Sequence, residues 1–147
     1  MPEFNPDRPL IVCVDDNLDQ LDGYEALLET RGKIITFSSP KEALAKLPLL
    51  SPRMFVFDVE MPGMTGFDLA TRVRIDMPRH DGAPILFVSG LDRKLNLENA
   101  IRAGGDDFLS KPVPTPSLRA TVDALLSLSG IADPYERHQR YLKIRPA

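Results

Sequence analysis

The chain has 147 residues, and its hydrophobic fraction of 43% and charged fraction of 27% are typical of one globular domain and exclude a disordered chain. A net charge of −3 and a pI near 5.4 argue against direct binding of nucleic acid or of an anionic membrane surface. No apolar run approaches the length of a membrane span and the opening residues lack a secretory pattern, so we expect a cytoplasmic protein.

Short apolar runs alternate with amphipathic segments along the whole chain. The runs predict β-strands over residues 10–14, 33–37, 54–59, 84–89 and 107–110. The segments that follow them carry apolar residues at three- and four-residue steps, and they predict helices over residues 18–31, 40–47, 67–75, 95–103 and 116–126. Alternation of this kind is typical of βα units, so we expect an α/β domain with a doubly wound, five-stranded parallel sheet.

The domain spans residues 9–128, with a short lead at 1–8 and a tail at 129–147. Thr115 is predicted to cap the last helix of the domain, with Pro116 at its first position. Asp133 and Pro134 have the pattern that starts a short helix in the tail. Cys13, the only cysteine, lies in an apolar run and is expected to be a buried, inert thiol. The basic residues of the tail are predicted to form a solvated surface; they are Arg137, Arg140, Lys143 and Arg145.

Asp58 stands out because it interrupts the apolar run at 54–59. A carboxylate in or beside a buried strand is costly unless it is paired, hydrogen-bonded or bound to a metal. The residues that follow, Met61-Pro-Gly-Met-Thr-Gly66, predict a sharp turn that leaves Asp58 at the carboxyl edge of the sheet. Asp58 is therefore the first functional candidate, and the alternative is an acid that only caps the turn.

The other predicted strands also end in polar side chains. Asp15 and Asp16 follow the first strand, Ser89 ends the fourth, and Lys111 follows the fifth. In a doubly wound sheet these ends converge at the switch point between the first and third strands. Each residue has an ordinary structural explanation by itself, such as a helix cap or a surface lysine, but together they predict a site.

These residue types suit phosphoryl transfer to an aspartate. Clustered carboxylates repel one another unless a hard divalent cation binds them, and Asp15, Asp16 and Asp58 are a suitable oxygen-ligand set for Mg²⁺. Ser89 would donate a hydrogen bond to the phosphoryl group and Lys111 would neutralise a further oxygen. The expected product is an acyl phosphate on Asp58, formed from a phosphohistidine or a small phosphodonor.

From about Pro9 to Leu128 the chain resembles the response-regulator receiver domain of two-component signal transduction. The matching features are the acidic pair, Asp58 with its loop, Ser89-Gly90, Gly104-Gly-Asp-Asp-Phe108 and Lys111-Pro112. The resemblance implies a CheY-like, flavodoxin-like (βα)5 fold with strand order 2-1-3-4-5. It also implies a histidine kinase or phosphotransfer protein as phosphodonor, and Mg²⁺ or another divalent cation such as Mn²⁺ as cofactor.

The resemblance also implies roles for individual residues. It implies that the backbone carbonyl of Glu60 joins Asp15, Asp16 and Asp58 as a metal ligand. It implies that Ser89 and Phe108 form the switch, with Ser89 moving toward the phosphoryl group and Phe108 turning inward. It further implies a cis peptide bond between Lys111 and Pro112. Phe108 lacks the hydroxyl common in the family, so any signal that needs a phenol hydroxyl is absent. The Glu60 side chain adds an acid beside the metal, so the phosphoryl lifetime does not carry over from the family.

We expect a signalling module, not an enzyme, that assists only its own phosphorylation and dephosphorylation. Its output is predicted on the face formed by the fourth helix, the fifth strand and the fifth helix, with polar contacts from Arg93, Lys94, Arg102 and Arg119. The tail is expected to lie against that face or against a second protomer. The cognate kinase, the output protein and homodimer formation stay open.

Three alternatives come from other functional classes. An aspartate-nucleophile phosphohydrolase also ends an apolar strand in an acid, but it uses its first strand and needs more chain to cover a substrate. A phosphorylation-independent scaffold would keep the fold and lose the site. A flavodoxin-type cofactor binder is disfavoured because its phosphate would meet Asp15 and Asp16. His80 and His138 fall in a predicted loop and the tail, so catalytic histidine chemistry has no support.

Overall fold

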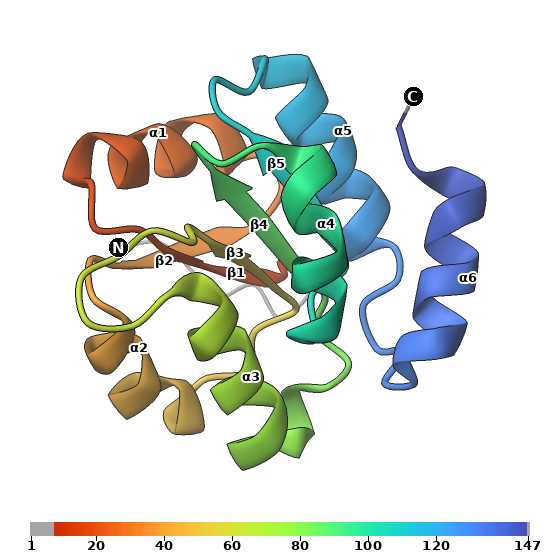
Figure 1. Ribbon diagram of the computed structural model, residues 1–147, viewed down its shortest axis with the longest axis horizontal. Coiled ribbons are helices and arrows are strands. Elements are labelled where there is room, and N and C mark those ends of the chain that lie inside the picture. The colour runs from red at the N-terminus through yellow and green to blue at the C-terminus, as the bar shows by residue number, and fades with distance from the viewer. Residues whose placement is uncertain (1–7, 147) are drawn as a thin grey trace.

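The computed structural model describes residues 8–146, so all but one residue of the predicted lead lies outside the described residues. Five parallel strands form one sheet in the order β2-β1-β3-β4-β5, which confirms the predicted α/β fold (Figure 1). The strands are β1 (Leu10–Val14), β2 (Lys33–Phe37), β3 (Met54–Phe57), β4 (Ile85–Ser89) and β5 (Asp107–Ser110). β3 ends at Phe57, two residues earlier than predicted, and Asp58 is the first residue beyond it.

Helices cover both faces of this sheet (Figure 1). One face packs against α2 (Pro40–Lys46), α3 (Gly66–Asp76) and α4 (Arg93–Arg102), and the other packs against α1 (Leu18–Leu28) and α5 (Thr115–Leu126). Short 3₁₀ turns follow α2 and α3 at Leu47–Leu49 and Pro78–His80. Within residues 8–146, no helix has the length and apolar character needed to cross a membrane.

The two faces divide the strand residues by alternation, as a pleated strand requires. Val12, Phe57 and Phe87 point to the α2–α3–α4 side, whereas Cys13 and Val56 point to the α1–α5 side. All five are buried, because the sheet is covered on both faces. Cys13 is a free, buried thiol as predicted, and burial raises its pKa, which disfavours the reactive thiolate.

Side-chain caps start several helices: α1 and α2 begin at the predicted residues, whereas α4 begins two residues earlier than predicted. Asn17, Ser39 and Asp92 each accept a hydrogen bond from a backbone N–H in the first turn of the helix that follows. The prediction for Thr115 is wrong: α5 begins at Thr115 itself, Pro114 occupies the cap position, and no side chain caps this helix. The predicted cis peptide bond between Lys111 and Pro112 is present.

Gly66 fixes the loop after β3 close to the sheet. A Cβ atom at this position would lie 2.0 Å from the carbonyl oxygen of Asp58, so only glycine allows the start of α3 to approach the strand end this closely. Thr65 and Asp68 then form a reciprocal capping box at the start of α3. The loop between Asp58 and α3 is therefore anchored at its far end.

The tail forms α6 (Pro134–Ile144), capped by Asp133, and this helix lies beside α5 at the β5 side of the sheet (Figure 1). Tyr141 of α6 is buried in the α1–α5 core. Several apolar residues that marked the predicted helices are exposed instead of buried; they are Leu18, Ile75 and Leu95.

Candidate functional site

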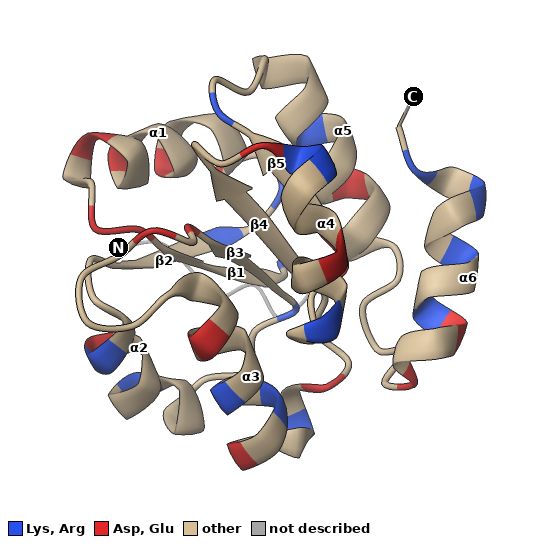
Figure 2. Cartoon of the chain, viewed as in Figure 1, with Lys and Arg blue, Asp and Glu red and all other residues tan. Residues whose placement is uncertain are grey.

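The register between β1 and β3 brings two carboxylates together. Val14 pairs with Phe57, so the next residues, Asp15 and Asp58, leave the sheet side by side. The backbone N–H of Asp58 donates to the carbonyl of Val14 at 2.9 Å, which fixes this arrangement. Asp15, Asp16 and Asp58 each offer a carboxylate oxygen, and these oxygens lie within 4.8 Å of one another. Figure 2 shows these acids in red where β1 and β3 end.

Lys111 reaches this acidic cluster from the far edge of the sheet. Its backbone N–H extends the β4–β5 ladder by donating to the carbonyl of Ser89 at 2.7 Å. Its Nζ lies 3.0 Å from Oδ2 of Asp15 and 3.7 Å from Oδ1 of Asp58. The fold therefore places one ammonium group between two buried carboxylates whose strands are separated from β5 by β4.

The charge at the site is not balanced. The pKa of the Asp58 carboxyl is raised to about 6, first by burial, then by the charge of Asp15 and to a smaller extent by that of Asp16. Lys111 and the hydrogen bond from the Val59 N–H, 2.9 Å from Oδ1, only partly oppose this effect. The cluster holds three carboxylates but one ammonium group, which pairs with two of them. A divalent cation would compensate this surplus of hard oxygen ligands.

Of the two predicted switch residues, Ser89 ends β4 at the carboxyl edge of the sheet, where the acidic cluster lies, and Phe108 lies within β5. Ser89 is fully buried at the end of β4, and its Oγ accepts a hydrogen bond from the N–H of Leu91 at 3.3 Å. The Phe108 side chain is fully buried in the α2–α3–α4 core. Glu60 is exposed, and a Cβ atom added to Gly90 would lie 3.9 Å from its Oε1. The metal role of the Glu60 carbonyl stays a prediction.

The family model of the response regulator receiver domain matches residues 11–123, which include every predicted site residue. The chain belongs to the response regulator receiver family.

Similar proteins agree with this membership. An uncharacterized 14.6 kDa protein of Leptolyngbya boryana is 38% identical over 104 residues, which are 70% of this chain and 79% of that protein. The alkaline phosphatase synthesis transcriptional regulatory protein PhoP of Bacillus subtilis is 30% identical over 125 residues, 84% of this chain but only 51% of PhoP. The structure of the chemotaxis response regulator CheY4 of Vibrio cholerae has the same fold, with a TM-score of 0.75, 24% identity, and coverage of 80% of this chain and 98% of CheY4.

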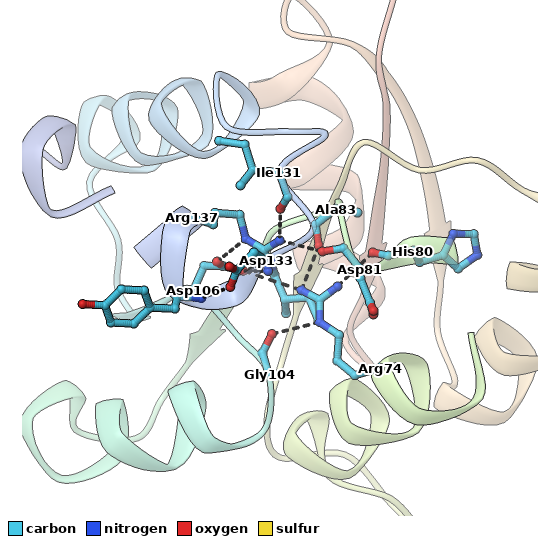
Figure 3. Close-up of polar contacts among 11 residues, drawn as sticks. Arg74, His80, Asp81, Ala83, Gly104, Asp106, Ile131, Asp133 and Arg137 are labelled. Atoms are coloured by element: carbon cyan, nitrogen blue, oxygen red, sulfur yellow. Dashed lines mark hydrogen bonds and ion pairs between the residues drawn. The ribbon is translucent and has the colours of Figure 1, made fainter. Parts of the chain in front are cut away.

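This receiver domain also contains a charged cluster that the sequence analysis missed. Arg137 was predicted to be solvated, but it is 1% exposed and its Nε lies 2.6 Å from Oδ1 of Asp106 (Figure 3). Arg74 approaches the other oxygen of Asp106 at 3.6 Å, and the Ile85 N–H donates to that oxygen at 2.8 Å. Two arginines thus share one buried carboxylate at the amino-terminal end of the sheet.

The signal for this cluster was weak. Asp106 and Asp107 are two consecutive acids at the start of an apolar strand. Burying a carboxylate there costs as much free energy as at the end of a strand, unless the carboxylate has a basic or hydrogen-bonding partner. The partner of Asp106 lies 31 residues away in the tail, and nothing in the local pattern of α6 separates Arg137 from Arg140. The acids alone could have indicated that some basic residue packs there, but not which one.

Proposed function

We propose that this receiver domain accepts a phosphoryl group on Asp58 from a histidine kinase or a histidine phosphotransfer protein and thereby changes its contacts with an output protein. The observation that carries the proposal is the unbalanced cluster, in which Lys111 pairs with Asp15 and Asp58 while Asp16 adds a third carboxylate. Such a cluster gains stability from a divalent cation and from a group whose oxygens bind both that cation and the lysine.

One oxygen of Asp58 is suited to act as the nucleophile. Oδ1 accepts the Val59 N–H and lies nearer Lys111, whereas Oδ2 accepts no hydrogen bond from the described residues. Oδ2 would attack phosphorus while the bond from phosphorus to the donor's imidazole nitrogen breaks, and the electron pair of that bond stays on the imidazole. Bound Mg²⁺ or Mn²⁺, held by Asp15, Asp16, Asp58 and the Glu60 carbonyl, would neutralise the acids and the phosphoryl oxygens.

The remaining site residues would recognise the phosphoryl group once it is attached. The ammonium group of Lys111 is already 3.7 Å from Asp58 and would contact one phosphoryl oxygen. The Oγ of Ser89 would turn from the Leu91 N–H and donate to another oxygen. Since these steps act only on the protein's own aspartate, we infer a signalling module that is not an enzyme.

The output surface is proposed on the α4–β5–α5 face, with one change from the sequence analysis. Arg93 lies there, because it donates to the carbonyl of Phe108 at 3.0 Å. Lys94 is exposed, and Arg102 pairs with Glu98 on its own helix. Arg119 instead donates to the carbonyl of Leu27 on α1 at 3.0 Å, so its side chain is engaged away from α4.

Incubation with acetyl phosphate and Mg²⁺, followed by intact mass measurement, tests the proposal. The wild-type chain should gain one phosphoryl group, and Asp58→Asn should gain none. Asp16→Ala should remain folded but lose the Mg²⁺-dependent reaction, whereas Asp19→Ala, the same change of an exposed acid on α1, should react like the wild type.

The same experiment separates the alternatives. Continuous consumption of acetyl phosphate with multiple turnovers of an added phosphate ester would indicate a phosphohydrolase. A folded wild-type chain that gains no mass, even with a phosphorylated histidine phosphotransfer protein as donor, would indicate a phosphorylation-independent scaffold.

A further inference from the structure

The helix α6 is held against the sheet by the acidic pair at the start of β5. Arg137 pairs with Asp106 and also donates to the carbonyls of Asp81, at 2.6 Å, and Ile131, at 2.5 Å (Figure 3). The hydroxyl of Tyr141, one turn further along α6, donates to Oδ2 of Asp107. These two side chains are the buried residues of the helix.

The rest of α6 contributes little to its attachment. Leu142 and Ile144 are 44% and 47% exposed, Tyr135 is 72% exposed, and the basic residues Arg140 and Lys143 are exposed. An isolated helix of eleven residues is marginal in water, so α6 depends on its contacts with the domain. The attachment of α6 therefore depends on two side chains, Arg137 with its polar contacts and Tyr141, whose ring packs in the α1–α5 core, and loss of these contacts would release the helix as one unit.

Asp107 connects α6 to the region of the candidate site. Its Oδ1 accepts a hydrogen bond from Arg93 at 3.1 Å while its Oδ2 accepts one from Tyr141, so one carboxylate binds both α4 and α6. Arg93 also donates to the carbonyl of Phe108, the residue next to Asp107. Any movement of the start of α4 therefore removes a charge partner from the carboxylate that holds α6.

A continuous set of contacts joins the start of α4 to Ser89. The N–H of Leu91 donates to the Oγ of Ser89 at 3.3 Å, and the carbonyl of Leu91 accepts from the Oγ of Ser110 at 2.8 Å. Leu91 lies two residues before Arg93. If the Oγ of Ser89 turns toward a phosphoryl group on Asp58, Leu91 loses its hydrogen bond and Arg93 loses part of its anchor.

We propose that α6 is a detachable cover of the α4–β5–α5 face and that phosphorylation of Asp58 releases it. The inference rests on the proposed function. When Arg93 moves away, the Asp107 carboxylate, which is 6% exposed in the docked state, keeps its burial cost but loses its positive partner, and release of α6 lets water reach it. The coupling is reciprocal, so loss of α6 docking should also favour the phosphorylated arrangement.

Release would uncover a surface that the docked helix now obstructs. Beside the C-terminal end of α6 lies a cavity of about 380 Å³, lined by Arg93, Asp107, Leu109, Thr121 and Arg145. Without α6 this cavity becomes part of an open face that includes the edge of β5. An output protein that binds this face must therefore compete with α6, which makes the helix an internal inhibitor of that contact.

Hydrogen exchange of the α6 amides in the full chain tests two claims: that Tyr141 holds α6 in the docked state, and that phosphorylation of Asp58 releases the helix. Tyr141→Phe removes only the hydroxyl that binds Asp107, and Tyr135→Phe is the matched control on the exposed side of the same helix. Tyr141→Phe should speed exchange in Pro134–Ile144 by about tenfold or more, because a hydrogen bond to a charged group is lost. Tyr135→Phe should exchange like the wild type.

Mg²⁺ and beryllofluoride, a phosphoryl mimic, should then speed α6 exchange in the wild type and in Tyr135→Phe, with little further effect in Tyr141→Phe. Unchanged α6 exchange in Tyr141→Phe would overturn the claim that the Tyr141 hydroxyl holds α6 in the docked state. Unchanged α6 exchange in the wild type, while the loop after Asp58 responds to beryllofluoride, would overturn the coupling and leave the proposed function standing. No response at either place, together with no mass gain from acetyl phosphate, would overturn both.

Discussion

Two buried carboxylates at opposite ends of the same sheet have opposite electrostatic surroundings. Asp58 and Asp106 are 6% and 7% exposed. Asp58 faces two other acids and one lysine at 3.7 Å, whereas Asp106 binds Arg137 at 2.6 Å, has Arg74 at 3.6 Å and accepts the Ile85 N–H. Burial raises the pKa of Asp58 to about 6, while around Asp106 the positive charge is in excess, and burial lowers the pKa of Arg74 to about 10.

The difference distinguishes a candidate functional site from an ion-pair cluster that only stabilises the fold. The donors of the second cluster are used, since Arg74 also binds the carbonyls of Gly104, His80 and Ala83. The acidic cluster has oxygens left over and lies where strands end, so it retains capacity for a cation and a phosphoryl group. Three substitutions of aspartate by asparagine, together with one histidine variant, test this comparison.

The largest effect is expected for Asp106→Asn. The change keeps the size of the side chain but removes the carboxylate that Arg74 and Arg137 share, which leaves two buried cations without their common ion-pair partner. The free energy of unfolding should fall by about 3–5 kcal/mol. Urea denaturation at pH 7.5 measures this, and a loss below about 1 kcal/mol would contradict the assignment of the cluster as structural.

The same substitution at Asp58 should change the free energy of unfolding in the opposite direction. The folded-state pKa of Asp58, about 6, lies above its ordinary value of 3.8. The folded state therefore loses stability through ionisation of this group as the pH rises from about 3.8 to about 6. At pH 7.5 without metal, Asp58→Asn should raise the free energy of unfolding by about 1–2 kcal/mol. The gain should vanish below pH 4, where the carboxyl is protonated in both states, and shrink when Mg²⁺ stabilises the wild type.

A smaller effect concerns the pH dependence near the structural cluster. His80 is 3% exposed, its Nε2 lies 2.9 Å from the carbonyl of Leu47, and burial lowers its pKa below the ordinary 6.5. Because the folded state disfavours the proton, wild-type stability should fall as pH drops through 6.5. His80→Gln should reduce the dependence of the free energy of unfolding on pH between pH 7.5 and 5.5, as measured by urea titrations. His138→Gln, the control on α6, should keep it.

The smallest effect is expected for Asp76→Asn. Asp76 pairs with Arg72 one turn away at 2.9 Å, but both side chains are about half exposed. An exposed ion pair of this kind contributes little, so the free energy of unfolding should change by less than about 0.5 kcal/mol. A change as large as that of Asp106→Asn would show that burial is not what distinguishes the two acids.

Local patterns predicted most of the domain and the members of the candidate site. The strand that carries Asp58 was recognised because an acid interrupts an apolar, β-favouring run before a Pro-Gly turn. Asp15 and Lys111 were recognised because each follows such a run, and parallel strand ends meet at one edge of the sheet. The fine detail was less accurate, since the boundaries of β3 and α5 depend on one or two backbone hydrogen bonds.

By itself the sequence determined the five βα units, their order in the sheet once the family resemblance is included, and the set of acids and the lysine that meet at its edge. These features follow from side-chain periodicity and short turns, which act over a few residues. Only the tertiary structure decided that Arg137 is buried and that Tyr141 binds Asp107, because those partners lie 31 and 34 residues apart. A basic or aromatic residue on an amphipathic helix has the same local pattern whether it faces water or a distant carboxylate, and only the packing of α6 against β5 selects between them.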